Sequence, residues 1–126
     1  MPIPKKYAHI NFYPTAAMAE AADRGLRYRE KAGGRGGLTT RQAGEAGVGS
    51  GVQRAVQIKY RREILPETVR RMVAFFSRHE KNAAVDPGKE PHEDAGHVAW
   101  LLWGGDPGRR WATRIVEQMR KADEAA

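Results

Sequence analysis

The chain has 126 residues, no cysteine and a formal net charge of +7. Its length fits a single domain over residues 1–126, because two cores of half this size would each be close to the limit of self-stability. The lack of cysteine excludes disulfides and thiolate metal sites, and it suits a reducing compartment better than a disulfide-stapled secreted scaffold.

Neither the N-terminal residues nor the apolar runs indicate export or a membrane span. Residues 1–7 are polar and lack the apolar core of a signal peptide. The longest apolar run, residues 98–103, is far shorter than the ~20 residues that a transmembrane helix needs. We therefore expect a soluble protein without a signal peptide and without a membrane-spanning segment.

The positive charge is concentrated in the first half of the chain. Residues 1–62 contain 12 Lys or Arg and 4 Asp or Glu, whereas residues 63–126 contain 10 and 11. This asymmetry favours an anionic partner, which can be nucleic acid, an acidic protein surface or a membrane surface. A basic surplus on a small domain is equally compatible with a solvated face that binds nothing.

An N-terminal arm and a helix are the first predicted elements. Pro14 disfavours helix in the residue before it, so residues 1–13 are expected to form an arm with a short extended segment. Thr15 suits the N-cap of a helix that runs to about Lys31 and ends at the glycines of positions 33–34. The apolar stripe of this helix contains Met18, Ala22, Leu26 and Tyr28, and its other faces carry Arg24, Arg27 and Arg29.

A glycine-rich stretch at residues 33–51 precedes a basic helix. Its composition predicts a flexible region of low local stability, and its glycine runs lack the Gly-x-x-x-x-Gly-Lys-Ser/Thr spacing of a phosphate-binding loop. Ser50 can cap a helix over residues 52–61, where Arg54 would assist an anion at the helix start. The basic residues expected to lie outward on this helix or at its end are Arg54, Lys59, Arg61 and Arg62.

The strongest helical pattern covers residues 66–80. Pro66 suits the first helical position, and Glu67 places an acidic side chain in the first turn. Apolar side chains then recur at three- and four-residue spacing, which predicts one buried stripe. That stripe contains Val69, Met72, Val73 and Phe76, and the residues expected to lie off it are Arg70, Arg71, Phe75 and Arg78.

Two further helices are predicted in the C-terminal third. After a polar connection, Asp94 can cap a short helix over residues 95–103 that has no polar face and must be surrounded by others. The glycines at 104–105 end it. Asp106 is then expected to cap a last helix that begins at Pro107 and frays over residues 122–126. The inward stripe of the last helix contains Trp111, Ile115 and Met119.

Together these elements predict a mainly α fold, a compact bundle of about four to five helices with a short extended N-terminal segment and Gly-rich loops. The tight turn between the last two helices is expected to place Trp100 or Trp103 beside Trp111. Because each indole buries a large apolar area, Trp111→Ala is expected to cost about 3–5 kcal/mol of stability.

Two local patterns resemble chemical sites. Arg78-His79-Glu80 offers a base beside a carboxylate, but adjacent helical residues do not face each other, and His79 is more simply a cation near a helix C-terminus. His92 and His97 lack the four-residue separation of the His-Glu-x-x-His zinc motif. We therefore predict no catalytic residue, no metal, no cofactor and no small-molecule substrate, and hence a non-enzymatic protein.

Four segments combine into a more specific pattern. They are residues 24–26, residues 65–72, residues 75–80 with Arg-His-Glu, and residues 99–112 with Trp-Leu-Leu-Trp-Gly-Gly-Asp. This combination resembles a small family of phage- and prophage-encoded proteins associated with head-morphogenesis genes. The resemblance covers most of the chain, but residues 41–51 depart from the more regular basic segment of the family.

The resemblance implies a phage context, in the virion or the host cytoplasm, and it brings no catalytic residues. Arg78, His79, Glu80 and Asp106 would then form a functional surface. Alternatively, a buried arginine–carboxylate pair and a helix cap account for the same residues by structure alone.

Two functions therefore remain open. The first is a structural or head-assembly accessory protein that binds phage capsid or connector proteins through its basic half. The second is a basic nucleic-acid-binding accessory protein that contacts DNA phosphates. In either case the residues expected to bind nucleic acid or an acidic partner are Arg24, Arg27, Arg54, Lys59, Arg61, Arg62, Arg70 and Arg71.

Overall fold

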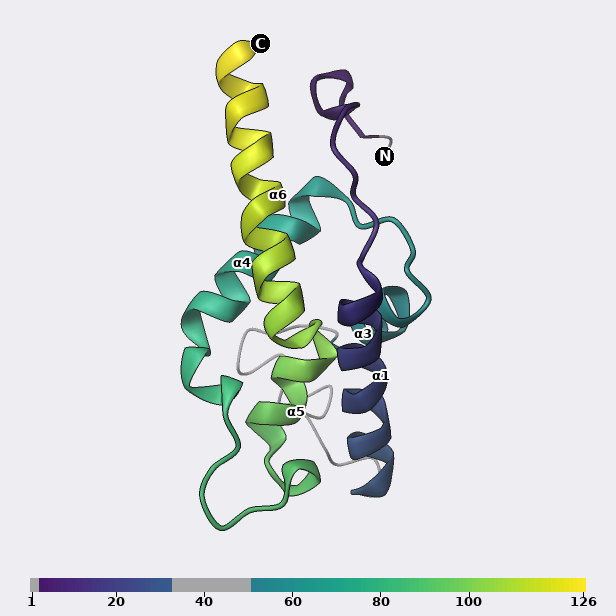
Figure 1. Cartoon of the computed structure of the whole chain (residues 1–126), viewed down its shortest axis with the longest axis vertical. Coiled ribbons are helices and arrows are strands. Elements are labelled where there is room, and N and C mark those ends of the chain that lie inside the picture. Colours follow the sequence, from purple (N-terminus) through teal and green to yellow (C-terminus); the bar gives the residue numbers. More distant parts are fainter. Residues whose placement is uncertain (1–2, 33–50) are drawn as a thin grey trace.

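The computed structural model of the chain describes residues 3–32 and 51–126 (Figure 1). Over these residues the protein is a bundle of α-helices without a strand, which confirms the predicted fold class. Its helices are α1 (Ala16–Lys31), α3 (Gly51–Lys59), α4 (Pro66–Arg78), α5 (Ala95–Leu102) and α6 (Gly105–Ala125), joined by the 3-10 helices η1 (Lys5–Tyr7), η2 (Glu80–Ala83) and η3 (Pro91–Glu93). Residues 33–50 of the predicted flexible region at 33–51, and the Ser50 cap, lie outside the described residues, whereas Gly51 begins α3.

Local capping signals set the ends of several helices as predicted. The hydroxyl of Thr15 accepts a hydrogen bond from the Met18 backbone N at 3.2 Å, and α1 ends at Lys31. Pro66 occupies the first turn of α4. Within the described part of the chain, no helix combines the length and the apolar character that a membrane span requires.

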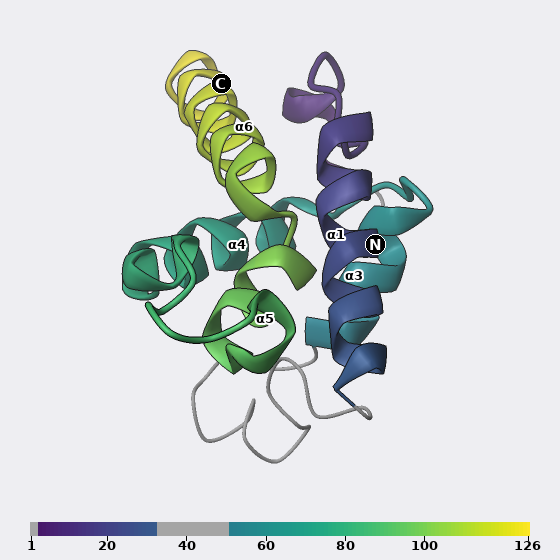
Figure 2. The same ribbon diagram turned by 60° about the horizontal axis from the view of Figure 1, so that its bottom comes forward.

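The short helix α5 lies at the centre of the bundle. In both ribbon views it is placed between the α1–α3 pair and α4 (Figures 1 and 2). Its residues 98–102 and the following Trp103 are all buried, as expected for a helix without a polar face. Gly25 lets α1 approach α5 closely, because a Cβ at this position would lie 3.0 Å from the backbone N of Leu102.

Four aromatic side chains, Phe75, Phe76, Trp100 and Trp103, form what we call the aromatic cluster. The ring of Phe75 stacks on that of Trp103 with centroids 4.8 Å apart, and Phe76 meets Trp100 edge to face at 4.8 Å. Trp100 or Trp103 was expected to pack on Trp111, but the rings of both pack on phenylalanine rings of α4, and no ring contact with Trp111 occurs among the described residues. Phe75, expected off the buried stripe, is 2% exposed because Trp103 covers that flank of α4.

The turn between α5 and α6 is built on glycine. Gly104 has a φ of 107° and Gly105 a φ of 62°, both in the left-handed region that favours glycine. This turn lets α6 begin at Gly105, with Gly104 as its N-cap and no side-chain cap. The prediction that Asp106 caps α6 was therefore wrong. Asp106 lies in the first turn, where its carboxylate accepts a hydrogen bond from Trp100 Nε1 at 2.9 Å.

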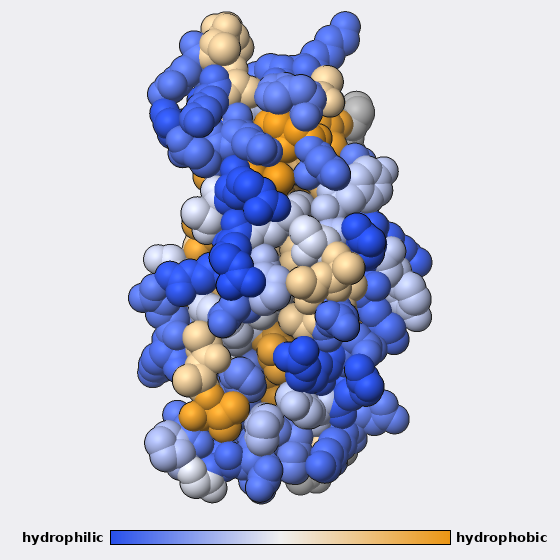
Figure 3. Space-filling view, viewed as in Figure 1, coloured by the Kyte–Doolittle hydropathy of each residue, from blue (hydrophilic) through white to orange (hydrophobic). Residues whose placement is uncertain are grey.

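The two ends of the chain stabilise each other. Tyr7 Oη donates to Asp123 Oδ1 at 2.6 Å, and Lys6 Nζ lies 2.9 Å from the same oxygen. The hydrogen bond from Tyr7 and the charge of Lys6 lower the pKa of Asp123. A hydrophobic area lies near the top of the face shown in Figure 3, between the N-terminal segment and α6, and smaller hydrophobic areas occur lower on the same face. The helix α6 continues to Ala125, and the fraying of residues 122–126 stays a prediction.

Asp94 gives a first testable prediction. Its carboxylate accepts hydrogen bonds from the backbone N of His97 at 3.1 Å, as predicted for a cap, and from that of Asp86 at 2.9 Å. Because Asp94→Ala would leave both N–H groups without this acceptor, we expect it to lower the free energy of unfolding by about 1–2 kcal/mol at pH 7, measured by urea denaturation.

The same carboxylate gives a pH dependence. Burial alone would raise the pKa of Asp94, but the hydrogen bonds from Asp86 and His97 lower it overall. A lowered pKa stabilises the fold above the ordinary carboxyl pKa, and this stability is lost as pH falls through the folded-state value. The difference between wild type and Asp94→Asn should therefore shrink from pH 7 to pH 3. Asp86→Asn is the control, because it keeps the backbone N–H that donates to Asp94. If wild type and Asp94→Asn differed in unfolding free energy by the same amount at pH 7 and pH 3, this account would be contradicted.

Candidate functional site

The predicted nucleic-acid contacts are divided among several places in the fold. Arg27 pairs at 2.6 Å with Asp23 of its own helix, and Lys59 of α3 lies 3.3 Å from the same carboxylate, so only Lys59 links α3 to α1. Arg70 donates a hydrogen bond to Tyr7 Oη at 3.1 Å, near the end of α6. Arg24 lines a hollow between α1 and α5. These side chains are exposed or partly exposed, but the helices direct them to different neighbours.

Arg54 does not point outward as expected. It is half-buried, and its guanidinium lies 6.0 Å from the ring centroid of Trp103. Burial lowers the pKa of Arg54, and the charge of Arg71 lowers it further. Arg71 itself is exposed and forms an i, i+4 ion pair with Glu67 at 3.3 Å. Arg54 therefore belongs mainly to the packing around α5. Helical periodicity did not predict this position, because it does not show that the ring of Trp103 lies against Arg54.

The Arg78-His79-Glu80 motif does not assemble an acid–base pair. Glu80 pairs with Arg109 of α6, and the ring of His79 packs 4.9 Å from that of Phe75. Burial, followed by the charges of Arg78 and Lys81, lowers the pKa of His79, which disfavours the cation expected at the end of α4. This motif therefore connects the end of α4 to α6 and to the aromatic cluster.

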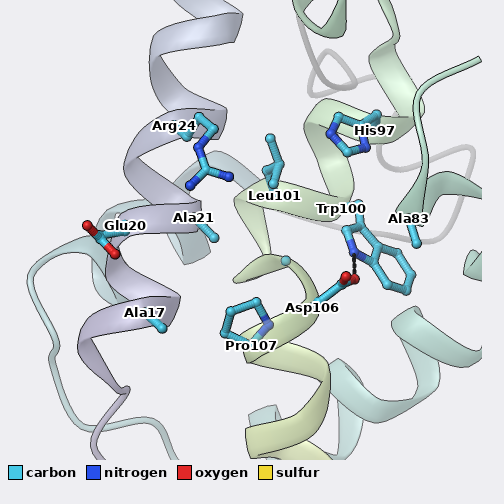
Figure 4. A pocket seen from close by; sticks show the side chains of 11 residues that line it. Ala17, Glu20, Ala21, Arg24, Ala83, His97, Trp100, Leu101, Asp106 and Pro107 are labelled. Carbon is cyan, nitrogen blue, oxygen red and sulfur yellow. Dashed lines mark hydrogen bonds between the residues drawn. The ribbon is translucent and has the colours of Figure 1, made fainter.

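A hollow of about 280 Å³ lies where α1, α5 and the start of α6 meet (Figure 4). Arg24 and Glu20 come from α1, and Glu20 points away from the centre in this view. His97 Nδ1 lies 3.0 Å from the Asn82 carbonyl oxygen, while Asp106 accepts its bond from Trp100. The hollow contains no hydroxyl or amine side chain, and the described residues contain no group of three or more His, Asp or Glu arranged to hold a metal ion. Its geometry favours no particular reaction.

The exposed large apolar side chains of the described residues occur elsewhere, on two segments that lie together. Tyr13 is 52% exposed, Tyr60 60% and Leu65 40%. The backbone N of Ile64 donates to the Phe12 carbonyl oxygen at 2.9 Å, which joins the connection between α3 and α4 to the N-terminal segment.

Two arginines complete this surface. Arg61 Nε donates to the Pro14 carbonyl oxygen at 2.9 Å, and the guanidinium of Arg62 lies 5.8 Å from the ring centroid of Tyr60. The tyrosine–arginine corner is our name for Tyr13, Tyr60, Arg61, Arg62 and Leu65. Sequence reasoning found its arginines and missed its apolar members. The available signal was Tyr60, which follows the last turn of α3 and lies off its buried stripe.

A groove of about 300 Å³ begins at this corner and separates the N-terminal segment from α6. Trp111 and Ile115 line it from α6, together with Arg114, and Tyr13 and Arg61 line its opposite side. No Asp or Glu is among its lining residues. The groove is therefore basic and partly aromatic, unlike the hollow of mixed charge in Figure 4.

Comparison with known proteins adds no assignment for this surface. No protein-family model, no curated protein and no solved structure matches the chain. The function must therefore be argued from the chain's own residues and their geometry.

Proposed function

We propose that this chain is a non-enzymatic accessory protein of phage head assembly, which docks onto a capsid or connector protein through the tyrosine–arginine corner. The observation that carries the proposal is the exposure of Tyr13, Tyr60 and Leu65 beside two arginines. Tyrosine and arginine are enriched at the centres of protein interfaces, because they combine apolar contact area with directed hydrogen bonds. The phage context rests on the sequence motifs at residues 65–80 and 99–112.

The distribution of charge supports a protein partner over nucleic acid. Arg27 and Lys59 share Asp23, and Arg71 is paired with Glu67, so these cations already have carboxylate neighbours. Nucleic acid presents a continuous series of phosphates, which favours a row of cations along one face. The surplus of basic residues at positions 1–62 still makes DNA binding the alternative to test.

Particle association tests this function. We expect the chain to co-purify with phage particles at a fixed molar ratio to the major capsid protein, measured by quantitative mass spectrometry, and to survive washing in high salt. Tyr60→Ala combined with Leu65→Ala should lower that ratio by at least about tenfold, because the pair removes the apolar contacts of the corner. Ser77→Ala, an exposed change on α4, is the control and should bind as wild type.

Two results would count against the proposal. One is absence of the chain from washed particles, and the other is an unchanged ratio for the double variant. Binding to DNA whose logarithmic affinity falls steeply with the logarithm of the salt concentration would favour the nucleic-acid alternative.

A further inference from the structure

We propose that the groove between the N-terminal segment and α6 binds an acidic segment of the partner protein, with Arg61 and Arg114 pairing with its carboxylates. The inference rests on the proposed function, because it specifies the chemistry of the partner segment. It identifies Arg114, which the sequence did not single out, as a binding residue.

Arg61 is held in a conformation that places its guanidinium at the groove. Its φ of 52° lies in the left-handed region, which is uncommon for a residue with a side chain. The hydrogen bond from Nε to the Pro14 carbonyl oxygen fixes the side chain against the N-terminal segment. Because that bond uses Nε, the two terminal Nη groups remain able to donate a pair of hydrogen bonds to a carboxylate.

Arg114 lines the same groove from α6 and, unlike Arg109 and Arg120 of that helix, forms no ion pair with a carboxylate of the described residues. Arg109 pairs with Glu80, and Arg120 pairs with Glu117 and Glu124. Arg114 is exposed and has no ion pair within the described residues. Since the groove is lined by two guanidinium groups and no carboxylate, an anionic group from outside would find two cationic partners there.

The remaining walls favour a peptide over a chain of phosphates. Tyr13 exposes half of its side chain at the edge of the groove, whereas Trp111 and Ile115 also line it but are only 2% and 3% exposed. A segment that alternates acidic and apolar side chains matches both kinds of surface. Arg24 and Arg70, by contrast, contact other parts of the fold, so the groove does not continue into a row of cations along one face.

The test is fluorescence anisotropy with three labelled probes of equal length. One is a peptide in which Asp and Glu alternate with Leu, the second replaces the acids with Asn and Gln, and the third is single-stranded DNA. We expect wild type to prefer the acidic peptide. Arg114→Gln and Arg61→Asn should each weaken this binding by about tenfold, because each removes a charge-assisted pair. Asn also tolerates the left-handed backbone at position 61, so Arg61→Asn tests the side chain.

Arg120→Gln is the matched control, because it removes an arginine of α6 whose partners lie on its own helix. Equal binding of the acidic and amide peptides, or wild-type affinity in both groove variants, would overturn the proposal. DNA binding that needs both arginines and exceeds peptide binding would also overturn it. If the chain stays on particles while the groove variants change nothing, the groove assignment fails and the proposed function stands. If the chain binds the acidic peptide through both arginines but does not associate with particles, the groove assignment stands and the proposed function fails.

Discussion

Replacing Trp100 with alanine is expected to lower the free energy of unfolding by about 3–5 kcal/mol, measured by urea denaturation. The side chain is 1% exposed and packs edge to face on Phe76. Its Nε1 also donates to Asp106 at the start of α6. Removal of the indole would therefore open a cavity at the centre of the bundle and break a link between α5 and α6. Such a loss is a large part of the ~5–15 kcal/mol that stabilises a typical domain.

Two variants separate the parts of this effect. Asp106→Ala removes the hydrogen bond and keeps the ring, so it should cost about 0.5–1.5 kcal/mol. Tyr60→Ala removes an exposed ring and should change stability by no more than about 0.5 kcal/mol. A Trp100→Ala protein within about 1 kcal/mol of wild type would contradict the central role of the aromatic cluster. Trp111 is also buried, and the corresponding loss for Trp111→Ala stays a prediction.

Gly108→Ala is expected to destabilise the protein by about 1–3 kcal/mol, although alanine is the better helix former. A Cβ at this position would lie 2.7 Å from the carbonyl oxygen of Trp103. That oxygen belongs to the backbone of the turn between α5 and α6, so relief of the clash requires the two helices to move apart. Thermal or urea unfolding would measure the effect.

Gly96→Ala provides the matched comparison, because it makes the same substitution in α5. There the new Cβ would meet the end of the Asn82 side chain, with Oδ1 at 2.6 Å. A flexible side chain can rotate away, so Gly96→Ala should be close to neutral, or stabilising by up to about 1 kcal/mol through helix propensity. Equal effects of the two alanine substitutions would show that the close approach at Gly108 does not govern the turn.

Helices whose ends depend on local signals were predictable from the sequence. Thr15, Pro66 and Asp94 act within one helical turn of their own positions, so pattern reasoning located the starts of α1, α4 and α5. The start of α6 was misplaced because two consecutive left-handed glycines allow it to follow α5 directly. The hydrogen bond between Tyr7 and Asp123 near the end of α6 joins residues 116 positions apart in sequence, so no local pattern predicts it.

The candidate site was less predictable, because its surfaces combine distant segments. Composition and periodicity identified Arg61 and Arg62 as exposed cations, but not the N-terminal segment that lies against Arg61. Periodicity also placed Arg54 outside, whereas the ring of Trp103 lies against it. Arg114 was overlooked because the opposite wall of the groove comes from segments 50 residues or more away in sequence. The residues around Arg114 in α6 do not show that these segments lie nearby.

Hydrogen–deuterium exchange of the chain alone and bound to phage particles would locate the docking surface most directly. The proposed function predicts slowed exchange at residues 57–65, and the groove predicts it at residues 9–16 and 110–118 as well. Slowed exchange restricted to the hollow between α1 and α5 would contradict the account. An unchanged exchange pattern in the presence of particles would contradict it too, because no part of the chain would then be covered by a partner.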